Sequence, residues 1–187
     1  MEFISDRISI ERQGDGVSFV LGTRLPKREG NLLILWLIAW TACGMAFLWE
    51  GVRGTVPGSR LPLFIMLAFW AYFELRIIRV VLWRRKGFEL WRVLDGELTI
   101  KNSLFRFGKA NRYFIANIQR LGPLNMDKAS WKWQMSDSFW TRGAEQLGFE
   151  YLGRKVAFGR GLTEEEAHKL VKVLSVELKR ERKADQK

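Results

Sequence analysis

The sequence predicts a membrane-spanning helical hairpin followed by an α+β domain, in which about six or seven antiparallel strands precede one C-terminal amphipathic helix. Three observations support this fold class. Two long apolar segments lie close together, at residues 31–49 and 61–83; an alternation of apolar and polar residues follows; and the chain closes on an apolar stripe at helical spacing. The 187 residues suffice for one modest domain with attachments.

The first apolar segment runs from Leu32 to Trp49 and carries no charge. As a helix it would extend about 27 Å, close to the ~30 Å hydrocarbon core of a bilayer. It lacks the polar stripe that a core helix of a soluble protein usually shows. We therefore expect a transmembrane helix, in which Ala42 and Ala46 offer a pair of small residues for helix packing.

The second apolar segment begins at Leu61 and is interrupted by Glu74, Arg76 and Arg79. The interpretation we favour has the helix leave the bilayer near Phe73, with the two arginines extending to the lipid headgroups. The alternative buries Glu74 and Arg76 as part of a proton or ion path. Residues two positions apart do not face each other on a helix, which argues against a direct Glu74–Arg76 pair.

Basic residues flank the helical hairpin on both sides and are sparse in its connecting loop. The positive-inside rule therefore predicts that both termini are cytoplasmic, in a multi-pass protein of an inner (plasma) membrane. Tryptophan and basic side chains at the ends of a span commonly anchor it in the headgroup region. The expected membrane-interface anchors are Trp49, Trp83, Arg76, Arg79, Arg84, Arg85 and Lys86.

The chain divides into an N-terminal arm at 1–29, the helical hairpin at 30–84, a cytoplasmic domain at 85–183 and a frayed tail at 184–187. Apolar residues alternate on both sides of Gly14 in the arm, which predicts a small β-hairpin. This β-hairpin either adds strands to the domain or lies flat on the membrane, and we favour added strands.

Several strands and one helix are expected within the cytoplasmic domain. Asp95-Gly96 separates two alternating runs and predicts a tight type I′ turn. Further strands are expected near residues 104–107, 111–116, 118–124, 148–152 and 155–158. Thr163 and Glu166 form a capping box at the start of the final helix. The apolar stripe of that helix, which should pack on the sheet, contains Ala167, Leu170, Val171, Leu174 and Leu178.

The order of these elements, together with the closing phrase VAFGRGLTEEEAHKLVKVL, resembles bacterial membrane-anchored PH-like proteins, in which two transmembrane helices precede a cytoplasmic PH-like domain. The layout is also similar to that of the photosystem I assembly factor of chloroplasts and cyanobacteria. The resemblance covers residues 25–180. It implies a PH-like antiparallel sheet or barrel closed by the C-terminal helix and a non-catalytic role, and it assigns no functional residue.

Composition excludes several kinds of site. The chain carries a net charge of +11 with one His and one Cys, which excludes disulfide scaffolds and zinc sites built from several Cys and His. His168 falls on the polar face of the final helix and Cys43 inside the first span, so neither indicates catalysis. Three glutamates follow Gly159–Gly161 and argue against a phosphate site there. No catalytic motif is recognisable, and we expect no enzymatic activity, cofactor or metal.

The segment KNSLFRFGKANR combines basic residues with two phenylalanines and contains no acid. Such a segment can bind anionic lipid headgroups or an acidic partner. The alternative is a solvated strand edge with the phenylalanines in the core. The short acidic Asp95-Gly96 turn argues against classical phosphoinositide recognition, and a position facing the membrane accounts for the charge without nucleic acid. The candidate residues are Lys101, Arg106, Lys109 and Arg112.

An insertion at residues 125–146 exceeds the length of a normal β-hairpin loop and is rich in tryptophan. Large aromatic residues in such a loop mark membrane insertion or a partner surface. The alternative is a strand whose tryptophans pack on the sheet, and the sequence leaves both open. The candidate partner-binding residues are Trp131, Trp133, Met135, Phe139 and Trp140.

These observations predict a non-catalytic scaffold, accessory subunit or assembly factor that binds another membrane protein through its cytoplasmic domain. An anionic-lipid-sensing module is the second hypothesis. A transporter or channel component that uses Glu74 and Arg76 is the third. The sequence indicates neither the partner nor the oligomeric state.

Overall fold

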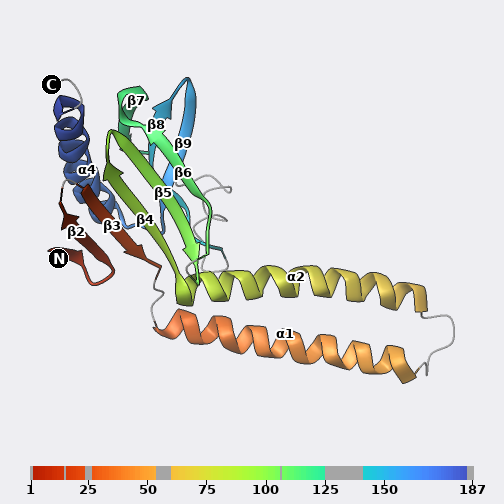
Figure 1. The fold of residues 1–187 in the computed structure, drawn as a ribbon. Coiled ribbons are helices and arrows are strands. Elements are labelled where there is room, and N and C mark those ends of the chain that lie inside the picture. Colours follow the sequence, from red (N-terminus) through yellow and green to blue (C-terminus); the bar gives the residue numbers. More distant parts are fainter. Residues whose placement is uncertain are drawn as a thin grey trace.

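The computed structural model describes residues 2–14, 16–23, 27–53, 60–105, 107–124 and 141–184. Two long helices extend side by side from one end of a strand-rich domain, and both chain termini lie on that domain (Figure 1). The elements are β1 (Glu2–Ser5), β2 (Ile8–Gln13), β3 (Gly16–Gly22), α1 (Lys27–Arg53), α2 (Arg60–Lys86), β4 (Gly87–Leu94), β5 (Glu97–Leu104), β6 (Ala110–Phe114), η1 (Ile115–Asn117), β7 (Ile118–Pro123), β8 (Glu145–Tyr151), β9 (Arg154–Arg160) and α4 (Glu164–Ala184).

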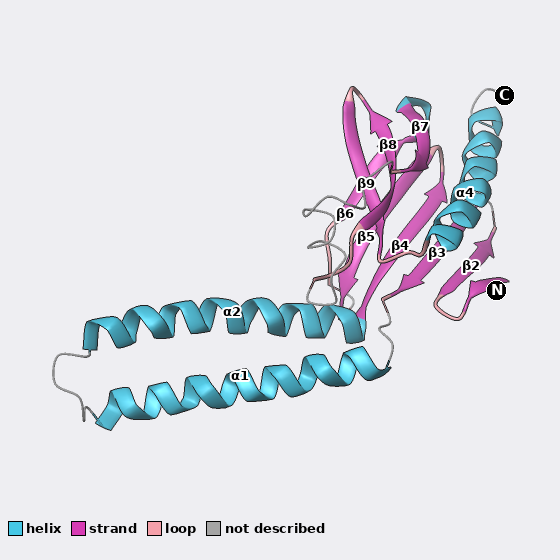
Figure 2. Ribbon diagram, turned by 180° about the vertical axis from the view of Figure 1, so that it is seen from behind, coloured by secondary structure: helices cyan, strands magenta, loops and turns pink. Residues whose placement is uncertain are grey.

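The strands form two antiparallel sheets, and α4 packs beside them (Figure 2). One sheet has six strands in the order β1-β2-β3-β4-β5-β6, and the other has three in the order β7-β8-β9. Within the described residues the two sheets do not join into one closed barrel. The structure therefore has the expected antiparallel strands and C-terminal helix, but its strands form two separate sheets.

The helical hairpin α1–α2 is inserted between two neighbouring strands of one sheet. β3 and β4 pair antiparallel, with Val17 opposite Val93 and Gly22 opposite Phe88. The residues before and after the helical hairpin thus build a single domain. The N-terminal arm therefore adds strands to the domain, which is the alternative that the sequence analysis favoured.

The β4–β5 connection has the geometry of the turn expected at Asp95-Gly96. Leu94 pairs with Glu97, and the two turn residues have φ values of 51° and 71°. Positive φ at both central positions is what a type I′ turn requires.

The strand expected at residues 104–107 is instead a tight turn. Leu104 is the last residue of β5, because it pairs with Gly87 at the start of β4. Phe105 then adopts a φ of 51°, and the backbone N–H of Leu104 and of Phe107 each donate to the other's carbonyl at 2.8 and 3.0 Å. The chain therefore reverses direction here before β6.

The core lies between the two sheets and α4. Trp91 on β4 is fully buried, and its ring meets Phe158 of β9 edge-on with centroids 4.9 Å apart. Phe19 of β3 is also fully buried beside Trp91. Leu170 and Leu174 of α4 complete the cluster with no exposed surface. Burial of these large side chains is the main source of stability for the domain.

The predicted capping box is present at the start of α4. The N–H of Thr163 donates to the carboxylate of Glu166 at 2.9 Å, and the N–H of Glu166 donates to the Thr163 hydroxyl at 3.3 Å. The expected apolar stripe faces the sheets, with Ala167, Leu170, Leu174 and Leu178 buried.

The two helices of the hairpin are long and apolar enough to cross a membrane. In the most apolar stretch of each helix, only 11% of the residues are buried inside the protein. They touch where small residues of α1 meet large ones of α2. A Cβ on Gly44 would lie 1.8 Å from the Trp70 ring, and a Cβ on Gly51 would lie 2.7 Å from Leu63. The close contact therefore uses these glycines, whereas Ala42 and Ala46 are exposed.

Candidate functional site

The junction between the helical hairpin and the domain is held by several hydrogen bonds that the sequence analysis did not foresee. α2 ends at Lys86 and β4 begins at the next residue, so no linker separates them. The Thr23 hydroxyl lies 2.7 Å from the Trp83 carbonyl oxygen and 2.8 Å from the Gly87 carbonyl oxygen, and it is buried. These bonds tie the end of β3 to the point where α2 becomes β4.

Gly87 is required at this point by a close approach. A Cβ on Gly87 would lie 2.4 Å from the Trp83 carbonyl oxygen and 2.7 Å from the Trp83 ring. Trp83 is only 4% exposed. Its ring therefore packs within the protein and does not present itself to lipid headgroups as an interfacial anchor would.

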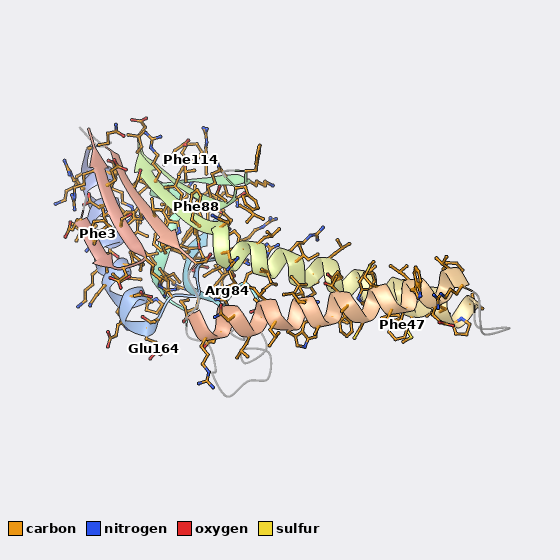
Figure 3. All side chains as sticks on the ribbon, turned by 90° about the horizontal axis from the view of Figure 1, so that it is seen from below. Phe3, Phe47, Arg84, Phe88, Phe114 and Glu164 are labelled. Atoms are coloured by element: carbon orange, nitrogen blue, oxygen red, sulfur yellow. The ribbon has the colours of Figure 1, made fainter. Side chains whose placement is uncertain are left out.

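Arginines from α2, from β9 and from the segment before β8 converge on the same junction. Arg84 donates from Nε to the carbonyl of Thr141 at 2.8 Å, and Figure 3 shows Arg84 where the helical hairpin meets the domain. The Arg142 guanidinium lies 5.7 Å from the centroid of the Trp83 ring. Partial burial, with Arg160 and then Arg79 nearby, lowers the pKa of Arg142 below its ordinary value. The junction is thus a concentration of positive charge, which attracts anions.

Within that group of arginines, Arg160 has an acidic partner. It forms an ion pair with Glu145, the residue opposite it in the β8–β9 pair. The backbone N–H of Arg160 also donates to Glu89. Among the described residues, Arg79 and Arg142 have no acidic partner in a salt bridge.

The β5–β6 turn lies at the same end of the domain. Leu104 pairs with Gly87, so the turn that follows lies beside the end of α2. Phe105 is 51% exposed and Phe107 is 83% exposed, which contradicts their placement in the core. Lys109 lies two residues after Phe107 and is exposed. An exposed pair of aromatic rings beside a basic residue is suited to the headgroup region of a bilayer.

The remaining residues of the basic segment are less close to the turn. Lys101 lies on β5 opposite Ala110, and Arg112 lies on β6 opposite Thr99. Arg112 is 4.0 Å from the carboxylate of Glu97 and has a side chain that is 74% exposed. Arg106 lies outside the described residues.

The other predicted interface anchors lie on the helices. Trp49 is 60% exposed, and the Arg53 guanidinium stacks 4.6 Å from the centroid of its ring. This pair is at the end of α1 that is remote from the domain. Among the anchors predicted on α2, Arg76, Arg79, Arg85 and Lys86 are exposed.

The candidate partner-binding residues of the aromatic insertion, Trp131, Trp133, Met135, Phe139 and Trp140, lie outside the described residues.

Two of the buried glutamates bear on how the parts of the protein are joined. Glu89 is 1% exposed and accepts hydrogen bonds from Trp91 Nε1 at 3.0 Å and from the N–H groups of Gly159 and Arg160 at 3.1 Å. Because Glu89 is on β4 and its donors include β9, its carboxylate joins the two sheets. Its position could have been read from the alternation, since Glu89 shares a face with Trp91 and Val93.

The second is Glu74, in the middle of the helical hairpin. It is 8% exposed, and its Oε1 lies 2.7 Å from the Thr41 hydroxyl on α1. Glu74 therefore packs against α1 while Arg76 is exposed, so the alternative interpretation, in which both side chains are buried, holds for Glu74 alone. The residue in the sequence that marks the partner of Glu74 is the hydroxyl-bearing Thr41 in the first apolar segment, because that segment contains no basic residue.

Within the described residues, no three His, Cys, Asp or Glu side chains form a group that could hold a metal ion. No protein-family model matches the chain, and the curated proteins contain no match to it.

Proposed function

We propose that this protein is a non-catalytic membrane-anchored scaffold, an accessory subunit or assembly factor that binds another membrane protein. The junction of α2 with β4 carries this proposal. The absence of a linker, the Thr23 bonds and the close packing of Gly87 on Trp83 hold the domain in one orientation relative to the helices. A domain held in this way offers its surfaces to a neighbouring membrane protein with little loss of rotational freedom on binding.

Because the helical hairpin is inserted within one sheet, all the strands should lie on the same side of the membrane. Because β3 pairs with β4, the chain segments before and after the helices belong to the same side of any bilayer that the helices cross. The basic flanks favour the cytoplasmic side of an inner membrane. The scaffold would therefore act on the cytoplasmic face, with both termini there.

A pull-down of the full-length protein tests this function. The C-terminus carries the affinity tag, a mild detergent extracts the membrane, and mass spectrometry identifies the proteins recovered. We expect a stoichiometric membrane protein that is lost when Trp131, Trp133 and Trp140 are changed to Ala without a change in the unfolding midpoint. Trp49→Ala, at the remote end of α1, is the matched control. Recovery of the protein alone would overturn the proposal.

An anionic-lipid-sensing module is the second candidate, and a specific observation favours it. Phe105 and Phe107 are exposed at the end of the domain where α2 emerges, beside the arginines of the junction. The rings would enter the headgroup region while the basic side chains attract anionic lipid. Such attraction weakens as salt rises, because mobile ions screen it.

Site-directed fluorescence in lipid nanodiscs tests the second candidate on the full-length chain. Phe107→Cys in a Cys43→Ala background receives an environment-sensitive dye, and the lipids carry a quencher near the headgroups. We expect strong quenching that falls with salt in anionic nanodiscs and weakens in neutral ones. The control is Leu152→Cys. Leu152 is exposed in the β8–β9 turn, at the end of this strand pair that is remote from Glu145 and Arg160. Equal quenching at both positions would remove this candidate.

A further inference from the structure

Glu74 lies at the centre of the apolar part of the helical hairpin. Its partner Thr41 is midway along the uncharged run Leu32–Trp49, about 12–14 Å from each end at ~1.5 Å per residue. The Trp70–Trp40 hydrogen bond of 3.0 Å fixes the same alignment of α2 on α1. If the helical hairpin spans a bilayer, as the proposed function requires, the Glu74 carboxyl is near the bilayer centre.

No cation among the described residues neutralises this carboxyl. The uncharged run of α1 offers it only the hydroxyl of Thr41, and the α1 thiol, Cys43, is exposed. On α2 the positions one turn away are Trp70, Ala71, Ile77 and Ile78, and the side chains of Tyr72, Arg76 and Arg79 are exposed. An ionised carboxylate without a counter-charge is very costly in hydrocarbon.

The hydrogen bonds of Thr41 favour a proton on Glu74. The Thr41 hydroxyl lies 2.8 Å from the Leu37 carbonyl oxygen and 2.7 Å from Glu74 Oε1. A hydroxyl has one hydrogen to donate, and a carbonyl can only accept. If Thr41 donates to Leu37, its oxygen accepts from Glu74, which must then carry the hydrogen on Oε1.

The second oxygen of Glu74 agrees with the same arrangement. Oε2 is buried and has no hydrogen-bond partner among the described residues. In a protonated acid with its hydrogen on Oε1, Oε2 is a neutral carbonyl oxygen. Burying a neutral carbonyl oxygen without a hydrogen-bond partner costs far less free energy than burying a charged carboxylate oxygen without one.

We propose that Glu74 is an intramembrane proton-binding site. Its ligand is a single proton, held on Oε1 in a chain from Glu74 to the Thr41 hydroxyl to the Leu37 carbonyl. The bound proton removes the charge and makes the contact between α1 and α2 a neutral hydrogen bond. Loss of the proton places a negative charge between the helices and loosens their contact.

Infrared difference spectroscopy of the full-length protein in lipid nanodiscs at neutral pH tests the proposal. Protonated carboxyl groups and carboxylates absorb at separate frequencies. We expect the spectrum of the wild type minus that of Glu74→Gln to contain the band of a protonated carboxyl. This band should shift in Thr41→Val, which removes the hydroxyl, and stay in place in Thr41→Ser, which keeps it. Glu50→Gln is the control, because Glu50 is exposed beyond the apolar run and should contribute a carboxylate band.

A carboxylate band lost in Glu74→Gln would overturn the proposal. If a variant does not incorporate into nanodiscs, an alkaline titration of wild-type protein with carboxyl-labelled glutamate replaces the comparison. A protonated band that disappears as the pH rises supports the proposal, and its absence at neutral pH overturns it. Failure of the wild type itself to enter nanodiscs would instead contradict the membrane anchoring in the proposed function.

Discussion

Arg7 and Glu166, 159 positions apart in the chain, form a two-pronged ion pair. Arg7 also donates to the carbonyl of Gly161 at 2.8 Å, and the Ser5 hydroxyl donates to the same carboxylate at 3.0 Å. Because Glu166 is also the acid of the capping box, this cluster joins the N-terminal strands to the first turn of α4.

The first prediction concerns the acid stability of this cluster. Burial would raise the pKa of Glu166, but the hydrogen bonds of Arg7, the Thr163 N–H and Ser5 outweigh it and lower the pKa from 4.5 to about 2. The stabilisation is therefore complete above pH 4.5 and is lost as the pH falls towards 2. It amounts to at most ~3 kcal/mol.

Chemical unfolding of the wild type and Glu166→Gln across this pH range measures the effect. The variant should lose about 1–3 kcal/mol at neutral pH and show a flatter acid dependence. Glu165→Gln, on the same helical turn but exposed, should behave as the wild type. An unchanged acid dependence in Glu166→Gln would show that another group is responsible.

The second prediction concerns the carboxylate between the two sheets. Glu89→Gln should lower the free energy of unfolding by about 2–3 kcal/mol, because its amide nitrogen would face a backbone N–H and leave it without an acceptor. Thermal unfolding followed by tryptophan fluorescence measures the loss. Glu97→Gln is the control, since its 4.0 Å pair with Arg112 is largely exposed and should contribute at most ~1 kcal/mol. Similar losses in both variants would contradict a specific role of Glu89.

The third prediction concerns the close approach at the junction. Gly87→Ala should destabilise the protein by about 1–3 kcal/mol, because the added methyl group meets the Trp83 carbonyl and ring. Limited proteolysis should cut the variant faster between α2 and β4. Gly122→Ala, where a Cβ would meet nothing within 4 Å, should leave both the stability and the cleavage rate unchanged. Equal behaviour of the two variants would argue against tight packing here.

The fourth prediction concerns the extent of the domain. Residues 1–23 joined to 87–187 through Asn-Gly should unfold cooperatively, because the two-residue turn closes β3 on β4 with their observed register. The fragment 87–187 alone should show no cooperative transition. It lacks five fully or nearly buried core side chains, those of Ile8, Ile10, Val17, Phe19 and Leu21. Circular dichroism during heating distinguishes the two, and a cooperative transition in the shorter fragment would refute the single-domain arrangement.

Features with a local cause could be predicted from the sequence. The capping box at Thr163 and Glu166, the turn at Asp95-Gly96 and the apolar helices each depend on residues a few positions apart. The turn at Phe105 was mistaken for a strand, because the pairing of Leu104 with Gly87 decides where β5 ends. That pairing is not visible in the local pattern.

The candidate site depends on contacts between distant segments. Thr23 and Gly87 meet only because β3 pairs with β4 across the helical hairpin. Thr41 and Glu74 meet because Gly44 admits Trp70 and so sets how the helices align. Neither alignment follows from hydrophobic periodicity, which shows the face of a helix but not its partner.

The position of the helical hairpin within the sheet has a consequence for synthesis. A ribosome completes β3 before either apolar helix and completes β4 only after both. The contact between Phe19 and Trp91 can therefore form only after both helices have been synthesised. During that interval the edge of β3 that later pairs with β4 has no partner strand and is open to incorrect pairing. If the two helices enter a membrane, as the proposed function requires, their insertion brings the ends of β3 and β4 together, and the six-stranded sheet is completed only after that step.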